Sequence, residues 1–403
     1  MNHLKLLLLN LILLFISIIN YSQENFTLNG YVLDINNNES IIGANIIIPS
    51  INSGTITNTY GFYSITVPKG SYEIHISSIG YKKIINKIDL SNNINTNYYL
   101  EQNIENLDEV ILTKDIEELD LKKPIMSLNI LSNQTIRQTP VLFGESDVLK
   151  TIQLLPGVSN AGEGSGGFNV RGGGADQNLI LFDEAIIYNS SHLFGLFSIF
   201  NSDAIKEAKL YKGGIPSSYG GRISSVLDVY QKDGNSKEHK LSGGVGVISS
   251  RILGEGPIKK NKGSYLIASR GSYAHLFLKF TDIENAAYFY DINTKSNYKL
   301  DDKNRLYFSG YFGRDKFKLS NTFSNTYGNS TLNLRWNHLI NKKTFSNTSL
   351  IFSDYYYGLT LNFIGFNWNS GIKNLNLKFD LKNYYSNNIQ FNYGLNSIYY
   401  EFN

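Results

Sequence analysis

Residues 143–230 constrain the fold more than any other segment of this 403-residue chain. They hold two glycine clusters, at 162–167 and 172–174, among short apolar runs. Glycine lacks a Cβ, so these clusters permit tight turns and close approach of backbones. The run 179–182 (LILF) is uninterrupted, which is typical of a strand buried on both faces. We therefore expect a compact α+β unit with several glycine-dependent turns.

The first glycine cluster formally contains the pattern GxGxxG. A dinucleotide site requires that pattern to follow a strand and to open a helix. Here a helix is predicted before it, capped by Ser146-Asp147 and running through Leu155, and a strand-like stretch follows at 168–171. The nucleotide interpretation is therefore rejected. Further along, 203–207 is predicted as a short helix that leads into a strand at 208–211.

Composition excludes several classes of function. The chain has no cysteine, which rules out disulfides, iron–sulfur clusters and thiol catalysis. Its six histidines form no ligand-spaced pair, so no zinc site is expected. A net charge of +3 is too small to indicate a nucleic-acid partner. No nucleophile stands beside a base, and we predict a protein that is not an enzyme and needs no cofactor.

The N-terminus is predicted to be a signal peptide, residues 1–22. Lys5 precedes an apolar run from Leu6 to Ile19 that is interrupted only by Asn10 and Ser17. This run is short for a membrane-spanning helix but fits a signal-peptide core. An N-terminal membrane anchor is the alternative. Either interpretation places the rest of the chain outside the cytosol.

Residues 233–403 alternate between apolar and polar side chains. Leu332, Leu334 and Trp336 alternate with Thr331, Asn333, Arg335 and Asn337, and similar patterns recur at 305–309 and 374–382. This period of two is typical of transmembrane barrel strands with one face to lipid and one to the lumen. Tyr355–Tyr357 would suit an aromatic girdle, although a soluble sandwich could show similar alternation. At ~10 residues per strand, roughly eight strands are expected, the first part of a large antiparallel barrel in an apparently truncated chain.

The order of motifs in 124–232 resembles the plug domain of TonB-dependent outer-membrane receptors of the Bacteroidetes type. The resemblance rests on Arg171-Gly172-Gly173-Gly174, then the block 212–216 (KGGIP), then Tyr219-Gly220-Gly221-Arg222. A plug fills a barrel of the ~22-stranded class, so the resemblance implies a gated importer. At 183–184 the family usually has Asp-Gly; Glu184 departs from that pattern and leaves the turn type open.

Residues 23–105 resemble the carboxypeptidase regulatory-like domain, a small antiparallel β-sandwich without hydrolytic chemistry. The matching residues include Gly43-Ala44, Gly61-Phe62-Tyr63 and Pro68-Lys69-Gly70. Between this domain and the plug lies a linker at 106–123. The whole chain is thus predicted to be mainly β: sandwich, α+β plug and the beginning of a barrel.

The resemblance assigns roles to particular residues. The linker segment Leu107-Asp108-Glu109-Val110-Ile111 resembles the TonB box, an extended peptide that would couple to TonB by strand addition, or would pack on its own sandwich. Contacts between plug and barrel are expected from Arg171, Gly172, Gly173, Asp183 and Arg222, with the guanidinium of Arg171 suited to a buried carboxylate. A loop that either contacts ligand or is only structural contains Asn189, Ser190, His192 and Phe194.

These patterns lead to one main functional hypothesis and one alternative. The main hypothesis is energy-coupled uptake of a siderophore, glycan, peptide or similar ligand through the outer membrane. Its partners would be TonB with its inner-membrane complex, outer-membrane lipids and, in some importers, a surface lipoprotein. The alternative is an exported β-rich binding or adhesion protein without transport. The sequence does not identify the ligand.

Overall fold

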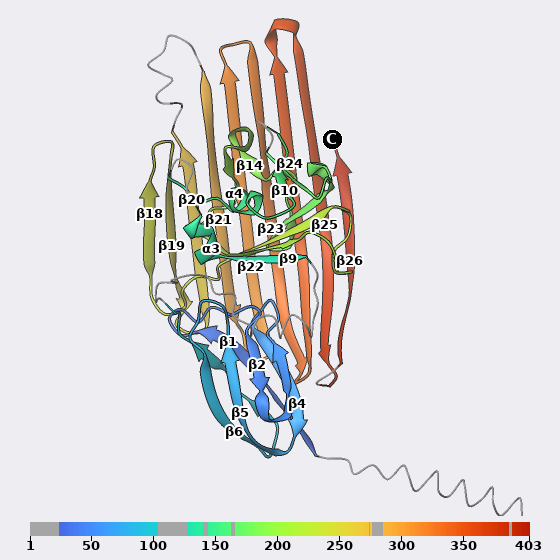
Figure 1. The fold of residues 1–403 in the computed structure, drawn as a ribbon. Coiled ribbons are helices and arrows are strands. Elements are labelled where there is room, and N and C mark those ends of the chain that lie inside the picture. The colour runs from blue at the N-terminus through green and yellow to red at the C-terminus, as the bar shows by residue number, and fades with distance from the viewer. Residues whose placement is uncertain are drawn as a thin grey trace, which may run out of the picture.

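The computed structural model describes residues 24–103, 127–139, 144–162, 166–273, 275, 285–386 and 389–403. It has three parts, which we call the small domain (24–103), the plug (127–233) and the wall (240–403). Figure 1 shows the plug lying against one face of a tall sheet, with the small domain below both. The structure is mainly β, as the sequence predicts. None of the described helices combines the length and apolar character needed to cross a membrane.

The small domain packs two four-stranded sheets around one core. One sheet joins β4 (Phe62–Pro68), β1 (Asn25–Asp34), β7 (Ile94–Asn95) and β8 (Tyr98–Leu100). The other has the order β3 (Ser53–Ile56), β2 (Asn45–Ile48), β5 (Gly70–Ser77) and β6 (Ile84–Leu90), with a 3₁₀ turn, η1, at Pro49–Ile51. The sandwich is not purely antiparallel, because β7 and β8 both run parallel to β1. The alternating residues Ile74 and Ile76 on β5 are fully buried, which explains the period of two in that strand.

The plug is built on a mixed five-stranded sheet. Its order is β13 (Ala185–Ile186), β12 (Asn178–Phe182), β17 (Ser225–Gln231), β16 (Ile205–Tyr211) and β9 (Leu128–Ser132), with β12 and β17 parallel. Two helices cover it, α3 (Asn133–Gln138) and α4 (Val148–Gln153). The remaining elements are two short strand pairs, β10 (Val158–Asn160) with β11 (Phe168–Val170) and β14 (Ser191–His192) with β15 (Phe197–Ser198), and the 3₁₀ turns η2 (Ala175–Gln177) and η3 (Leu193–Gly195).

Two of the helix predictions for the plug are tested here. Asp147 does cap α4: its carboxylate accepts from the amides of Leu149 at 2.8 Å and Lys150 at 3.1 Å. The helix ends at Gln153 rather than at Leu155. The helix predicted at 203–207 is wrong, because Ile205 already begins strand β16. There Ala208 pairs with Leu131 of β9 and with Val229 of β17, and these strand pairings outweigh local helix propensity.

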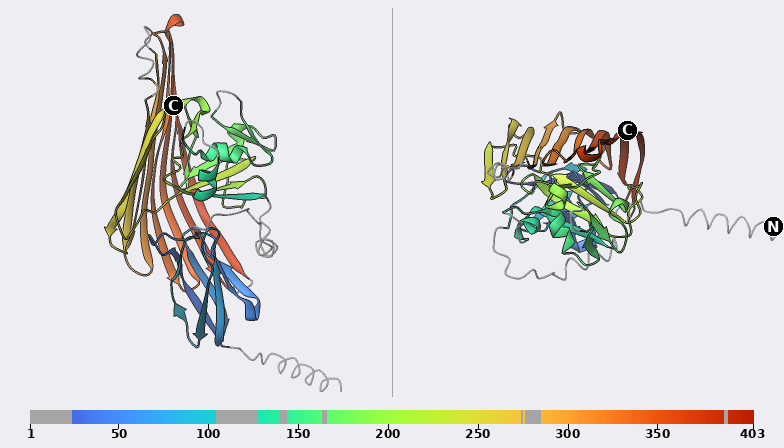
Figure 2. Two further views of the ribbon diagram at one scale, coloured as in Figure 1. Left: turned by 60° about the vertical axis from the view of Figure 1, so that its left-hand side comes forward. Right: turned by 90° about the horizontal axis from the view of Figure 1, so that it is seen from above.

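The wall is a meander of nine antiparallel strands, each paired with the next. These are β18 (Lys240–Val245), β19 (Ser249–Lys259), β20 (Gly263–Ser272), β21 (Ala286–Lys299), β22 (Asn304–Leu319), β23 (Phe323–Asn341), β24 (Thr344–Leu361), β25 (Phe366–Tyr384) and β26 (Gln390–Phe402), with the 3₁₀ turn η4 at Asn362–Ile364. Figure 2 shows that the sheet curves and that the plug lies on its concave side.

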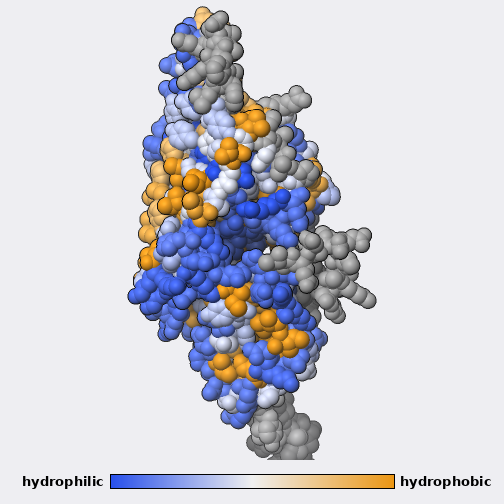
Figure 3. Space-filling model, turned by 90° about the vertical axis from the view of Figure 1, so that its left-hand side faces the viewer, coloured by the Kyte–Doolittle hydropathy of each residue, from blue (hydrophilic) through white to orange (hydrophobic). Residues whose placement is uncertain are grey.

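On the wall, the distribution of polar and apolar side chains between exposed and buried positions is the reverse of that in soluble proteins. Leu332, Leu334 and Trp336 on β23 are 50%, 54% and 44% exposed, whereas their neighbours Asn333 and Arg335 are 2% and 3% exposed. Charged and amide side chains are normally exposed, and rows of large apolar residues normally are not. Figure 3, with the sheet at the left, shows hydrophobic residues along its outer face. The predicted alternation is therefore present, with its polar side toward the plug.

The small domain is seated on the lower end of the wall through aromatic and polar contacts. Phe62 stacks on Phe345 with ring centroids 5.5 Å apart and meets Tyr384 edge-on at 6.0 Å. The Ser64 hydroxyl donates to the Lys342 carbonyl at 2.9 Å. All three wall residues lie on or beside β24 and β25, so the seat is formed by the lower ends of these strands.

Candidate functional site: the interface between plug and wall

The plug reaches the wall through a two-residue turn between β12 and β13. Phe182 pairs with Ala185, which leaves Asp183 and Glu184 as the turn residues. Their φ angles are +45° and +74°. Positive φ at both positions is the signature of a type I′ turn, which favours Asn-Gly and Asp-Gly. The turn type left open by the sequence is thus the one that Asp-Gly would adopt, with Glu184 accepting a left-handed conformation that costs about 1–2 kcal/mol without glycine.

Glu184 reaches three wall strands at once. Its carboxylate accepts from the Ser349 hydroxyl at 2.6 Å and the Asn347 amide at 3.2 Å, both on β24. Arg335 Nε on β23 lies 3.5 Å from Glu184 Oε2, and Lys378 Nζ on β25 lies 3.7 Å from Oε1. These are ion-pair distances without the alignment of a hydrogen bond. Glu184 is therefore the point at which the plug is bound most widely to the wall.

Asp183 extends the same group of charges to β21. It is 1% exposed, and its Oδ2 lies 3.3 Å from Lys295 Nζ, which also pairs with Asp233 at 3.1 Å. The Asp183 carbonyl accepts from Asn333 Nδ2 at 2.6 Å. We call Asp183, Glu184, Lys295, Arg335 and Lys378 the carboxylate cluster.

Electrostatics keeps the plug carboxylates of this region charged. Burial alone would raise the pKa of Glu184, but Arg335 and Lys378, together with hydrogen bonds from Ser349 and Tyr60, lower it to about 2. The pKa of Asp233 is also lowered to about 2, because Lys295 and Lys206 outweigh the effect of burial. Both side chains therefore act as fixed negative charges near neutral pH.

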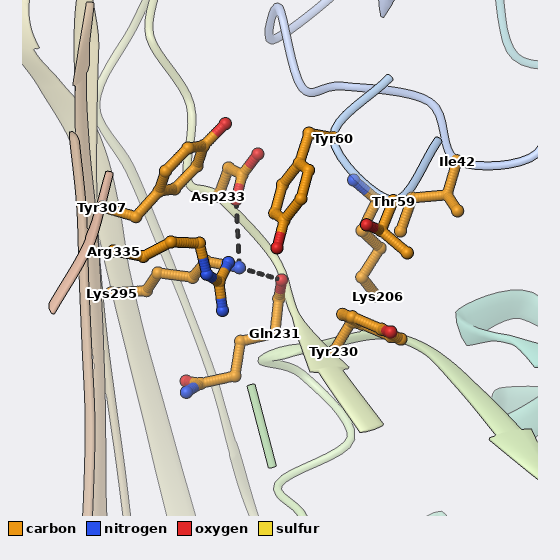
Figure 4. A pocket seen from close by; sticks show the side chains of 10 residues that line it. All are labelled: Ile42, Thr59, Tyr60, Lys206, Tyr230, Gln231, Asp233, Lys295, Tyr307 and Arg335. Atoms are coloured by element: carbon orange, nitrogen blue, oxygen red, sulfur yellow. Dashed lines mark hydrogen bonds and ion pairs between the residues drawn. The ribbon is translucent and has the colours of Figure 1, made fainter. Parts of the chain in front are cut away.

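Side chains from all three parts of the molecule line a small cavity beside this cluster (Figure 4). Ile42, Thr59 and Tyr60 come from the small domain, and Lys295, Tyr307 and Arg335 from the wall; the plug and the residues after it supply Lys206, Tyr230, Gln231 and Asp233. Lys295 Nζ donates to the Gln231 carbonyl at 2.8 Å. The cavity has a volume of about 10 Å³, which accommodates roughly one water molecule. The cavity is thus a junction between parts and too small for a nutrient ligand.

A second group of charges lies higher on the wall. His192 is 1% exposed; its Nδ1 is 2.6 Å from Asp315 Oδ2 on β22, and its Nε2 is 3.2 Å from Asp291 Oδ2 on β21. Arg270 on β20 binds Asp291 at 2.7 Å and Glu145 of the plug at 3.0 Å. We call His192, Asp291, Asp315, Arg270 and Glu145 the histidine cluster.

The carboxylates on both sides of the ring favour the charged form of His192. Burial alone would lower the pKa of His192, but Asp315 and Asp291 outweigh it and raise the pKa above its ordinary value. Both ring nitrogens face carboxylate oxygens, which only the doubly protonated ring can satisfy as donor. Its ring also stacks on Phe289 with centroids 4.3 Å apart. The plug therefore contributes a buried cation at this site.

The residues predicted to join plug and barrel do not all lie at the wall. Asp183 contacts the wall directly. Arg171 and Gly172 form the turn of β11, with φ of +49° and +82°, and Gly173 closes it by donating to the Val170 carbonyl at 2.9 Å. The Arg171 guanidinium is exposed and donates to the Ser127 hydroxyl at 2.7 Å. Within the described residues it does not form the expected buried carboxylate contact.

Arg222 is also exposed, and its guanidinium donates to the carbonyl of neighbouring Gly221 at 2.8 Å. The roles of Arg171, Gly172, Gly173 and Arg222 at the barrel thus remain predictions. The exposure of both arginines contrasts with the burial of Asp183.

The predicted ligand loop is mostly buried. Ser190 and His192 are 3% and 1% exposed, and Asn189 binds Asn329 of β23 through its carbonyl at 2.7 Å. Phe194 is 38% exposed, with its ring edge-on to Phe317 at 5.3 Å. A ligand contact from any of these four residues stays a prediction. The signal peptide (1–22) and the segment Leu107–Ile111 lie outside the described residues.

Sequence reasoning missed most partners of these clusters. The alternation of 331–337 places Arg335 in a polar row but does not reveal its partner Glu184, which lies 151 residues earlier in the chain. Tyr60, Arg270, Asp291 and Asp315 carry no such signal in the sequence. The charged residues within otherwise amide-rich inner rows were the available signal. No group of three or more metal-binding side chains occurs among the described residues.

Two domain families match this chain. Residues 28–112 match the family described as CarboxypepD_reg-like domain, and residues 120–226 match the TonB-dependent Receptor Plug Domain. Among curated proteins, the TonB-dependent receptor SusC of Bacteroides thetaiotaomicron is 27% identical over 247 residues. That match covers 58% of this chain and 23% of the relative.

Solved structures share the fold. The siderophore receptor PirA from Acinetobacter baumannii aligns with a TM-score of 0.53 at 14% identity, covering 72% of this chain and 50% of that chain. A mutant of the ferric enterobactin receptor PfeA from Pseudomonas aeruginosa gives 0.52 at 14% identity, covering 72% and 51%. The chain thus spans about half the length of these structures. With a regulatory-like domain at 28–112, a receptor plug domain at 120–226 and a wall that shares the fold of solved receptors, the chain is similar to the TonB-dependent receptors.

Proposed function

We propose that this chain acts in energy-coupled uptake through the outer membrane. The observation that carries the proposal is the wall itself: exposed apolar rows on one face, and buried amides and charges on the other, against which a plug is held. A lipid environment is the setting in which an apolar outer face and a polar interior are both satisfied. Homologous TonB-dependent receptors are outer-membrane proteins, which supports the same location here.

In the proposed mechanism, ligand binds from outside and TonB pulls on the segment at 107–113. TonB and its inner-membrane complex would supply the work, so this chain needs no nucleotide site. TonB would bind the segment by strand addition, through main-chain hydrogen bonds. The pull must then break or bypass the two charge clusters that hold the plug on the wall.

Ligand class remains the open part of this proposal. PirA and PfeA are described as siderophore and ferric enterobactin receptors, but at 14% identity they support the fold alone. The SusC relative is described as a TonB-dependent receptor, a description that names no ligand. We therefore propose a siderophore, glycan, peptide or similar ligand, without a narrower class.

Deletion of Leu107–Thr113 tests the proposal in the product of the complete gene. Uptake should be abolished while ligand binding at the cell surface remains, because the segment precedes the plug in the sequence and the deletion removes no plug or wall residue. Membrane fractionation tests the location: heat-modifiable migration from the outer membrane is expected. A product that is soluble without detergent would instead support the exported adhesion protein.

A further inference from the structure

The Glu184 side chain also makes a contact beyond those between plug and wall. A glycine would adopt φ of +74° freely, so the turn itself does not need a glutamate. The carboxylate nevertheless reaches the small domain: the Tyr60 hydroxyl donates to Glu184 Oε1 at 3.0 Å. Glu184 is thus bonded to the wall and to the small domain while belonging to the plug.

Tyr60 is held in a position where it depends on the same wall residues. Its ring stacks on Phe345 of β24 with centroids 5.5 Å apart, and the Arg335 guanidinium lies 5.3 Å from the ring centre. Figure 4 shows Tyr60 extending from the small-domain loop toward Arg335 and Lys295. Arg335 therefore contacts the small domain through Tyr60 and the plug through Glu184.

Removing either Glu184 or the Tyr60 hydroxyl takes a hydrogen-bond or ion-pair partner from the groups that remain. Without Glu184, the Tyr60 hydroxyl loses its acceptor, and Arg335 and Lys378 lose a counter-charge. Without the Tyr60 hydroxyl, one of the donors that hold the buried carboxylate is lost. A buried polar group deprived of its partner destabilises the arrangement that leaves it there. Because such coupling is reciprocal, each contact must strengthen the other.

We propose that Glu184 is a positioning residue that couples the seating of the small domain on the wall to the retention of the plug's β12–β13 turn. When the turn is withdrawn from the wall, the small domain loosens; when the small domain leaves, the turn is held less firmly. The coupling is a property of the fold, and only its use during uptake rests on the proposed function. The small domain would then report on, and resist, movement of the plug.

The seating of the small domain can be followed with spin labels, since the 403 residues contain no cysteine. Ile79 in the small domain and Leu300 at the lower end of the wall are 73% and 51% exposed, so both tolerate a labelled cysteine. In the product of the complete gene, purified in detergent, the distance distribution between the labels should be narrow. Glu184→Gln should raise the unseated fraction at least about fivefold, the lower end of typical coupling.

Two further variants separate coupling from a general defect. Tyr60→Phe keeps the stacked ring but removes the hydroxyl, and combined with Glu184→Gly it should add little, because each change alone already removes the hydrogen bond between the two side chains. Glu184→Gly suits the backbone, so the plug should fold while the small domain loosens as in Glu184→Gln. The matched control is Glu207→Gln, since Glu207 pairs with Lys209 of the same plug strand at 2.9 Å.

The reciprocal effect has its own readout. In Tyr60→Phe, hydrogen exchange at the amides of 183–187 should be faster than in the parent protein, while α4 amides are unchanged. The proposal is overturned if Glu184→Gln and Glu184→Gly leave the label distances as narrow as Glu207→Gln does, or if the two single effects simply add. Neither readout involves uptake, so a failure here is distinguishable from a failure of the proposed function.

Discussion

The carboxylate cluster and the histidine cluster hold the same plug to the same wall with different arrangements of charge. In the carboxylate cluster the plug supplies Asp183 and Glu184, and the wall supplies cations. The histidine cluster repeats this polarity in the pair of Glu145 with Arg270, but it also sets His192 of the plug between Asp315 and Asp291 of the wall. Around His192 the sign of the wall is thus reversed.

This reversal occurs over a short distance. Lys295 and Asp291 lie on the same face of β21, four residues apart, which corresponds to about 13 Å along the strand. A plug displaced by that distance would bring like charges together, and like-charge juxtaposition is unfavourable. Charge therefore specifies where the plug sits, in addition to holding it there. We expect the two clusters to respond differently to mutation and to pH.

Arg270→Ala should give the largest effect, because it removes from the histidine cluster the buried cation that two carboxylates share. The change leaves Asp291 and Glu145 without their shared counter-charge, and such a loss typically costs about 3–5 kcal/mol. Pulse proteolysis of the plug during a urea titration in detergent measures the loss. Arg314→Ala is the control, since that guanidinium lies over the rings of Phe312 and Tyr356 and should contribute below about 1 kcal/mol. Equal losses in the two variants would contradict the role of Arg270.

Lys295→Met should break the carboxylate cluster at β21 with a somewhat smaller effect. Methionine keeps the apolar stem but removes the charge between Asp183 and Asp233, and we expect a loss of about 3 kcal/mol. The same urea titration checks it. Because Arg335 and Lys378 still hold Glu184, the turn should remain on the wall without denaturant. Lys299→Met is the control, since Lys299 pairs with the exposed Asp302. An equal loss of unfolding free energy in Lys299→Met would contradict the role of Lys295 in the carboxylate cluster.

Raising the pH should weaken the histidine cluster but not the carboxylate cluster. The pKa of His192 is raised by folding, so its contribution is complete below the unfolded value of about 6.5 and is lost as the pH rises through the folded value. The pKa of Glu184 is lowered to about 2, so its contribution is present above the unfolded value of about 4.3 and is lost only as the pH falls toward 2.

Urea midpoints measured from pH 6 upward check this difference. The parent protein should lose stability as the pH rises, and His192→Gln should show a flatter profile. The groups that face His192 are Asp315, Asp291 and Tyr311, with Arg270 and Glu145 next to them. An unchanged slope in His192→Gln would assign the pH dependence to another group.

Asp147→Ala should give the smallest effect of the series. Asp147 caps α4 and also accepts from the Ser198 amide, while the Ser198 carbonyl accepts from Arg270 at 2.7 Å. Losing the cap should lower the free energy of unfolding of the plug by about 1–2 kcal/mol. Asp147→Ser restores a capping oxygen and should recover part of it in the same titration. If serine recovers nothing, the contact with Ser198 matters more than the cap.

Much of the fold was predictable because it depends on local pattern. The alternation at 331–337 predicted a strand with one apolar face, and the order of the glycine and arginine motifs predicted the plug. The helix at 203–207 was wrong because strand pairing with β9 and β17 decides that segment. The two parallel pairings of β1 were missed because short strands such as β7 carry too little pattern to show their partners.

The candidate site was less predictable than the fold. Asp183 was expected at the wall, and it lies there; His192 was placed in a loop open to ligand or merely structural, and it lies between two carboxylates. Arg171, expected to be buried, is exposed in the described structure. A side chain's type indicates which partners it could satisfy, but not which of them the fold brings within reach.

The sequence alone determined the period of the wall strands, the polar character of their inner face and the order of sandwich, plug and wall. These follow from interactions between residues near one another in the chain, through alternation, turns and motif order. Only the tertiary structure decided that Tyr60, Glu184 and Arg335 meet, and that His192 is enclosed by Asp291 and Asp315. Such pairings join residues more than ninety positions apart, and they exist because packing the three parts against one another brings these buried side chains within reach of their partners.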